Sequence, residues 1–369
     1  MVGIYRYIQL NKYFCALLHY DIKNKDKMAS RVIMLPFLLL LLYALYRVYD
    51  NNAFAINETG IWEVLTLVCG FVTIFLYFIG NEIDWWWWRK NPPKLADGFK
   101  LLLINHVSYY KNLSVENRVE FQNRIALYFK ANEFMPMGKL ADQDNEETGG
   151  YFDGGNSRAA ANEDKPLGRI PADIMLFAAS ALVQLTFGMK KWLLKKTDQV
   201  VIYPNPFPTP QMPDLFHTNE TFLEDKVIMF SAKQLLQYYT LGTAAYAICI
   251  HEYANAFQQN NPKIKFPDLP NDFWEQVEKI SGFSKSYLHE YMNLPAMDEV
   301  YAESGEFDDV QENEYRQVQR LNPQHVGVTL FFTHTSRFKE HLPDLHSAYC
   351  RIFHQDPTVK GNPMLVVSG

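Results

Sequence analysis

Two long apolar runs in the first quarter of the chain constrain its fold most. Neither residues 32–46 nor residues 64–79 contain a charge, and with its flanking residues each run reaches the length of a membrane-spanning helix, about 17 residues. A cleaved signal peptide would have one short run and a small-residue cleavage site, and the second run argues against it. A buried helical hairpin in a soluble protein is the alternative. We predict a transmembrane helical hairpin over residues 32–80.

Basic residues around the runs predict the orientation of the hairpin. Residues 1–31 contain several lysines and arginines, and basic residues also follow the second run. Residues 47–60 between the runs contain one basic residue, Arg47. By the positive-inside rule both termini are then cytoplasmic, at the inner (cytoplasmic) membrane. Trp85 to Trp88 beside Arg89 predict an interfacial linker over residues 81–94. Residues 1–31 form a cytoplasmic lead, in which either Met1 or Met28 could start translation.

Composition excludes several classes of function. A formal net charge of -6 provides no broad basic surface, so we expect no nucleic-acid partner. The four cysteines are far apart and lie in apolar contexts, which is typical of buried thiols in a reducing compartment. The sequence contains no GxSxG, P-loop or GxGxxG motif, which leaves nucleophilic-serine and nucleotide chemistry without support.

Residues 95–357 read as one mainly helical α+β domain with a small β-sheet, followed by a C-terminal tail over residues 358–369. Apolar periodicity predicts two helices within residues 101–134, with Ser114 beginning the second, and a long helix over residues 174–194. Strands are predicted at residues 200–203 and 226–231. Residues 138–168 are polar and glycine-rich and predict a surface insertion without a calcium loop.

The stretch from Tyr246 to Gln258 contains the residues that most resemble a catalytic motif. It reads YAICIHEYANAFQ, a helix with a His-Glu pair like the HExxH of zinc peptidases, in which two histidines four residues apart bind one zinc ion and the glutamate acts as general base. His251 and Glu252 are present, but Asn255 occupies the second histidine position. Alone, such a pair is more often a core histidine with a polar neighbour.

Four stretches together resemble the Mlc titration factor A family of zinc-dependent peptidases, whose zincin core is related to anthrax lethal factor. They are residues 109–134, 174–207, 251–255 and 330–357, the last with Phe-Phe and Gln-Asp-Pro at the family spacing. The resemblance implies a zincin fold, with Glu252 and Tyr315 at catalytic positions and His251, Asn255 and Asn322 at the three metal positions. Thr329 stands where the family has a further acidic residue.

One imidazole and two neutral amides lack the negative charge that holds zinc. Without the metal, Glu252 alone cannot generate a hydroxide nucleophile. An acidic residue could still be a ligand if the alignment shifts, or His325 could substitute; the acidic candidates are Glu303, Glu306, Glu312 and Glu314. A ligand supplied by substrate is a further alternative. Four other histidines lack a common spacing and are expected to be ordinary surface residues: His334, His341, His346 and His354.

The leading hypothesis is a membrane-tethered pseudopeptidase that needs no cofactor and binds a protein or peptide through the old cleft. The rival is an active zinc-dependent metallopeptidase with unconventional ligands. A third is a structural hairpin protein whose domain binds its partners through another face.

Overall fold

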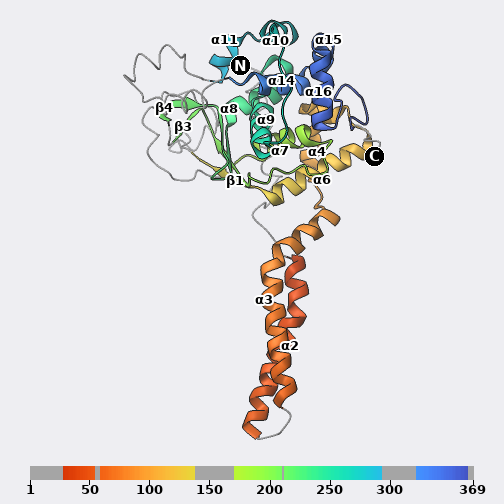
Figure 1. The fold of residues 1–369 in the computed structure, drawn as a ribbon, viewed down its shortest axis with the longest axis vertical. Coiled ribbons are helices and arrows are strands. Elements are labelled where there is room, and N and C mark those ends of the chain that lie inside the picture. Colours follow the sequence, from red (N-terminus) through yellow and green to blue (C-terminus); the bar gives the residue numbers. More distant parts are fainter. Residues whose placement is uncertain (1–27, 55–58, 138–169, 210–211, 293–320, 365–369) are drawn as a thin grey trace. The chain divides into compact units, whose positions relative to one another are not determined.

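The computed structural model describes residues 28–54, 59–137, 170–209, 212–292 and 321–364. The chain divides into a helical hairpin within residues 21–94 and a unit that contains residues 95–369. Each unit is considered by itself below (Figure 1).

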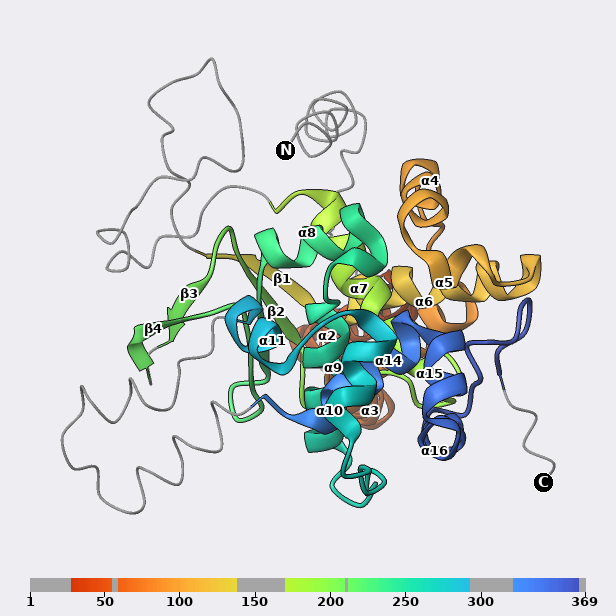
Figure 2. The same cartoon turned by 90° about the horizontal axis from the view of Figure 1, so that it is seen from above.

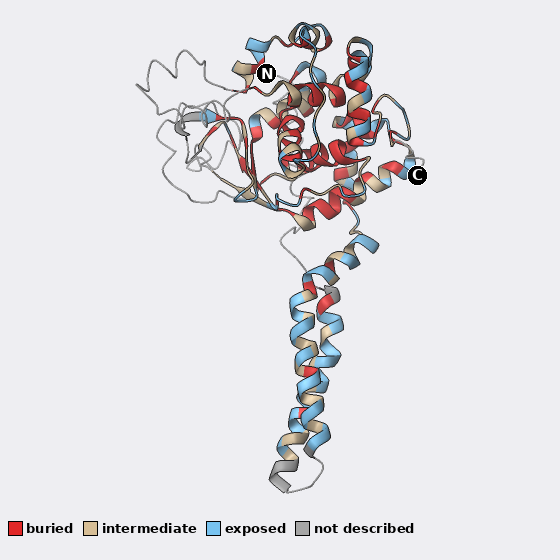
Figure 3. Cartoon of the chain, viewed as in Figure 1, coloured by how far each residue is buried: buried red, intermediate tan, exposed pale blue. Residues whose placement is uncertain are grey.

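The hairpin consists of α2 (Met28–Phe54) and α3 (Thr59–Lys90). Both helices are long and apolar enough to cross a membrane, as expected from the sequence. Most residues of the hairpin are exposed or half-buried (Figure 3). Many of the exposed ones are large and apolar, and a lipid environment would cover them. Within residues 81–94, where the sequence predicts an interfacial linker, α3 continues without a break to Lys90. Helix-breaking residues come only at Pro92 and Pro93.

A buried acidic residue fastens the two helices at one end of the hairpin. Asp84 on α3 is 2% exposed, and its carboxylate accepts hydrogen bonds from the Ser30 backbone N–H (2.7 Å) and hydroxyl (2.8 Å). Ser30 lies in the first turn of α2, where backbone N–H groups have no partner within the helix. Asp84 therefore satisfies part of the helix terminus and complements its dipole.

The second unit has three helices ahead of its sheet, where the sequence predicted two. They are α4 (Asp97–His106), α5 (Ser108–Lys111) and α6 (Val115–Ala131). The prediction that Ser114 begins a helix is confirmed, because its side chain accepts a hydrogen bond from the Asn117 backbone N–H.

A four-stranded sheet in the order β1-β2-β6-β5 lies along one side of the helices (Figures 1 and 2). β1 (Glu133–Pro136), β2 (Gln199–Tyr203) and β6 (Val227–Ser231) are parallel, and β5 (Asn219–Phe222) is antiparallel at the edge. Both predicted strands are confirmed, β2 and β6. β3 (Phe207–Thr209) and β4 (Met212–His217) form a separate two-stranded ribbon.

The helices on the other side enclose α9 (Ile248–Asn260), which packs against α7 (Ala172–Thr186), α14 (Pro323–Thr333) and β5. Nine of the 13 residues of α9 are buried. The remaining elements are α8 (Ala232–Leu241), η1 (Gly242–Ala244), α10 (Phe273–Ser281), α11 (Lys285–Tyr291), α15 (Thr335–His341) and α16 (Pro343–Phe353). The described chain is thus mainly helical with a small sheet.

The helix predicted over residues 174–194 ends earlier, at Thr186, because distant side chains bind its last carbonyl groups. Gln355 donates to the carbonyls of Gln184 (3.0 Å) and Leu185 (2.9 Å), and Arg124 donates to that of Thr186 (3.2 Å). Helix ends leave such carbonyls without intrahelical partners, and a cation suits the negative end of the helix dipole. Gln355 belongs to the Gln-Asp-Pro segment and is fully buried.

Candidate functional site

The buried helix α9 carries both candidate residues into the interior of the domain. His251 is 4% and Glu252 3% exposed. Consecutive residues on a helix point about 100° apart, so the two side chains meet different neighbours. His251 lies against α14, and Glu252 lies against the edge strand β5.

His251 belongs to a buried aromatic group. Its Nδ1 lies 2.7 Å from the Tyr246 hydroxyl, and its ring is nearly perpendicular to that of His325, at 85° with 5.4 Å between ring centroids. Burial lowers the pKa of His251 to about 3. Burial, and then the neighbouring His251, also lower the pKa of His325. Both imidazoles are therefore neutral at physiological pH.

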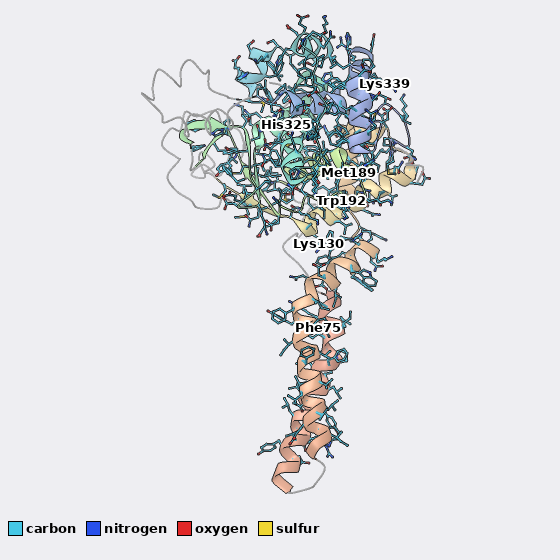
Figure 4. The ribbon with its side chains drawn as sticks, viewed as in Figure 1. Phe75, Lys130, Met189, Trp192, His325 and Lys339 are labelled. Carbon is cyan, nitrogen blue, oxygen red and sulfur yellow. The ribbon has the colours of Figure 1, made fainter. Side chains whose placement is uncertain are left out.

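His325 and Asn322 form the other half of this group (Figure 4 labels His325). Nε2 of His325 is 2.7 Å from Oε1 of Gln258 and 3.4 Å from Nδ2 of Asn322. Asn322 begins α14, where its side-chain oxygen accepts a hydrogen bond from the Gln324 backbone N–H (2.9 Å). The residue predicted at the third metal position is therefore a helix cap.

Glu252 is held by three donors. Its carboxylate accepts hydrogen bonds from the side chains of Asn219 and Thr221 on β5 and from Nδ2 of Asn255 (2.9 Å). Burial raises the pKa of Glu252, and the three hydrogen bonds oppose that effect. In this arrangement Glu252 joins α9 to the edge of the sheet.

Both polar atoms of the Asn255 side chain, at the predicted second metal position, form hydrogen bonds within the protein. Its nitrogen donates to Glu252, and its oxygen accepts from Nε2 of Gln259 (2.8 Å). His251 and Asn255 thus belong to separate hydrogen-bonded groups, the first on the side of α14 and the second on the side of β5.

A second buried acid near Glu252 was missed by the sequence analysis. Glu220 on β5 is 9% exposed, and its Oε2 is 3.7 Å from Nδ1 of the buried His217. Within the described part of the chain, Oε2 of Glu220 and Nε2 of His217 have no hydrogen-bond partner. Burial, followed by repulsion from Glu252, raises the pKa of Glu220 to about 8, and burial lowers that of His217 to about 4. No local sequence signal separates Glu220 from an ordinary surface acid.

The described residues around His251 do not fit a catalytic zinc ion. Such a site needs three protein ligands drawn from histidine, cysteine and carboxylate side chains. In the described ranges, the one cluster of three such groups lies elsewhere, at His346, Cys350 and Asp356. The predicted catalytic Tyr315 and the alternative ligands Glu303, Glu306, Glu312 and Glu314 lie outside the described residues.

A groove opens beside the His325 group. It has a volume of about 500 Å³ and combines glutamine amides with apolar side chains and one lysine. Gln258 contributes to the groove and also contacts His325, so the groove adjoins the buried histidines. Its lining residues are Gln258, Gln259, Pro262, Ile264, Lys265, Phe266 and Gln324.

No protein-family model matches the sequence, and no curated protein matches it.

Proposed function

We propose that the protein is a membrane-anchored relative of the Mlc titration factor A peptidases that binds a peptide or protein segment and does not cleave it. One observation carries the proposal: the carboxylate at the general-base position, Glu252, already accepts hydrogen bonds from Asn219, Thr221 and Asn255.

A peptidase of this type needs the glutamate to take a proton from a metal-bound water. The donors around Glu252 compete for the lone pairs that would accept that proton. The two amide side chains at the second and third metal positions also form hydrogen bonds. Asn255 donates to Glu252, and Asn322 accepts from the backbone at the start of α14. A water that is not bound to a metal keeps a pKa near 15.7 and is a poor nucleophile at neutral pH.

The groove provides a binding surface of suitable chemistry. Nε2 of Gln258 can donate to a peptide backbone and Oε1 of Gln259 can accept from one, because the opposite atoms of these amides bind His325 and Asn255. Ile264 and Phe266 add apolar surface. Lys265 favours an acidic side chain or a terminal carboxylate in the bound segment. The hairpin of α2 and α3 would hold this surface at the cytoplasmic face of the inner membrane.

One observation favours the rival function, an active zinc-dependent peptidase. His325 places a second imidazole against His251, and two histidines are common ligands of catalytic zinc. The rival needs a third ligand and a Glu252 released from its three donors.

Zinc content and proteolysis separate the two functions. The full-length protein in lipid nanodiscs, purified without a His tag, is compared with His251→Ala by elemental analysis and with Glu252→Gln by hydrolysis of labelled casein. We expect no zinc that depends on His251 and no hydrolysis that depends on Glu252. Zinc lost in His251→Ala together with hydrolysis lost in Glu252→Gln would establish the active enzyme.

Binding is tested with a random peptide library passed over the immobilised full-length protein. We expect enriched peptides to bind Ile264→Asp at least about tenfold more weakly, because the variant loses apolar contact area and places there a carboxylate that must be desolvated and that competes for Lys265. The matched control is Val359→Asp, at an exposed position outside the groove, which should bind like the wild type. Equal binding by wild type and Ile264→Asp would reject the groove as the binding surface.

A further inference from the structure

Three metal-binding side chains come together at the C-terminal end of the domain. His346 and Cys350 lie one turn apart on α16, and Asp356 follows the helix. One ligand atom from each residue lies within 4.8 Å of the other two. The sequence prediction that His346 is a surface residue is wrong, since it is 3% exposed.

The distance between His346 and Asp356 matches that between two ligands of a tetrahedral metal site, and the cysteine sulfur lies nearby. Nε2 of His346 lies 3.4 Å from Oδ1 of Asp356 and 4.0 Å from Sγ of Cys350. Zinc bonds of about 2.0 Å to nitrogen, 2.1 Å to oxygen and 2.3 Å to sulfur place tetrahedral ligands about 3.4 Å (N to O) and about 3.6 Å (N to S) apart. The sulfur of Cys350, which lies within 4.8 Å of the other two ligand atoms and 3.6 Å from Nδ1 of His346, would have to move toward Nε2 and Asp356 for the three groups to bind one ion.

Neighbouring residues already orient the ligands. Oδ1 of Asp356 accepts hydrogen bonds from the Thr358 backbone N–H (2.9 Å) and hydroxyl (2.6 Å), which hold the carboxylate in place. The hydroxyl would turn away for Oδ1 to bind a metal ion. Phe331 covers the His346 ring, with 5.2 Å between centroids. The Lys339 ammonium lies 3.3 Å from Oδ2 of Asp356 but is half exposed (Figure 4), so it can turn into solvent.

We infer that His346, Cys350 and Asp356 form a site for a thiophilic divalent cation, with zinc as the best match. Thiolate and imidazole ligands favour zinc over calcium and magnesium, which prefer oxygen. On binding, the Cys350 thiol releases its proton to solvent and its sulfur bonds the metal; no oxidation occurs. Three protein ligands leave the fourth position to water. The site uses none of the residues that line the groove or surround His251, so it does not depend on the proposed peptide binding.

Cobalt(II) is the probe, because a cysteine thiolate bound to it produces a charge-transfer band in the near ultraviolet. The reduced, metal-stripped, full-length protein in detergent is titrated with cobalt. We expect the band to saturate at one ion per chain, to vanish in Cys350→Ser, and to need at least about tenfold more cobalt in Asp356→Asn. The control Cys249→Ser, which alters a buried thiol on α9, should keep the band.

A wild type without the band, a band that persists in Cys350→Ser, or a band lost in Cys249→Ser would overturn the inference. Circular dichroism checks that each variant folds. If Cys350→Ser does not fold, Lys339→Gln provides the test, because it removes a cation beside Asp356 without touching a ligand. We expect cobalt to bind this variant about two- to fivefold more tightly, as for a half-exposed charge pair, and unchanged affinity would contradict the site.

Discussion

Glu220 gives the sharpest test of the burial of the edge strand β5. Its raised pKa, about 8 compared with 4.5 for an ordinary glutamate, means that the folded state holds a proton which the unfolded chain releases at lower pH. A raised pKa contributes stability that is complete below pH 4.5 and is lost as the pH rises through 8. Glu220→Gln removes this titration and keeps the shape of the side chain.

The size of the effect follows from the pKa. Each pH unit between 4.5 and 8 costs the wild type about 1.4 kcal/mol of unfolding free energy, so the loss is about 3 kcal/mol at pH 7 and approaches about 5 kcal/mol above pH 8. Both are order-of-magnitude values. Glu220→Gln should therefore match the wild type at acidic pH and exceed it increasingly as the pH rises.

Scanning calorimetry of the full-length protein in detergent measures the effect. For a unit of this size, about 1 kcal/mol shifts the melting temperature by about 2–4 °C, so Glu220→Gln should melt on the order of 10 °C higher than the wild type near pH 8.5. Glu224→Gln, in the exposed turn after β5, should melt like the wild type at every pH. If the difference in melting temperature between Glu220→Gln and the wild type stays the same from acidic to basic pH, the reasoning is refuted.

Three further substitutions test other contacts. Gln355→Leu leaves two buried carbonyl groups at the end of α7 without donors and should cost about 2–4 kcal/mol of unfolding free energy, measured by chemical denaturation; a loss below about 0.5 kcal/mol would contradict the capping role. Gly327→Ala places a Cβ 2.7 Å from the Tyr349 hydroxyl and should cost about 1–3 kcal/mol, recovered largely in the double variant with Tyr349→Phe; no recovery would place the strain elsewhere. Asp84→Leu removes both acceptors of Ser30, so the Ser30 amide should exchange hydrogen at least about tenfold faster; an unchanged rate would show that the pair does not fasten the hairpin.

Local sequence was enough for elements whose signal lies within one segment. The length and apolarity of the two runs predicted both hairpin helices. β-branched runs predicted β2 and β6, and Ser114 predicted the start of α6. Predicted helix ends were less accurate. The helix over residues 174–194 came out too long, because its end depends on Arg124 and Gln355, which are distant in sequence.

The candidate site divides in the same way. The sequence identified α9 and the pair His251 and Glu252, because the motif lies within one helix. It could not predict the partners of the pair, since Thr221 and His325 come from β5 and α14. A His-Glu pair on an exposed helix would have no such partners.

Which segments are apolar enough to span a membrane, and which helix contains the His-Glu pair, could be read from residues adjacent in the chain. That Glu252 binds donors from an edge strand, that Glu220 is buried on the same strand, and that His346, Cys350 and Asp356 lie together became visible only in the folded protein. Helix length and hydropathy are local properties, whereas burial and hydrogen bonding depend on contacts between residues far apart in the chain.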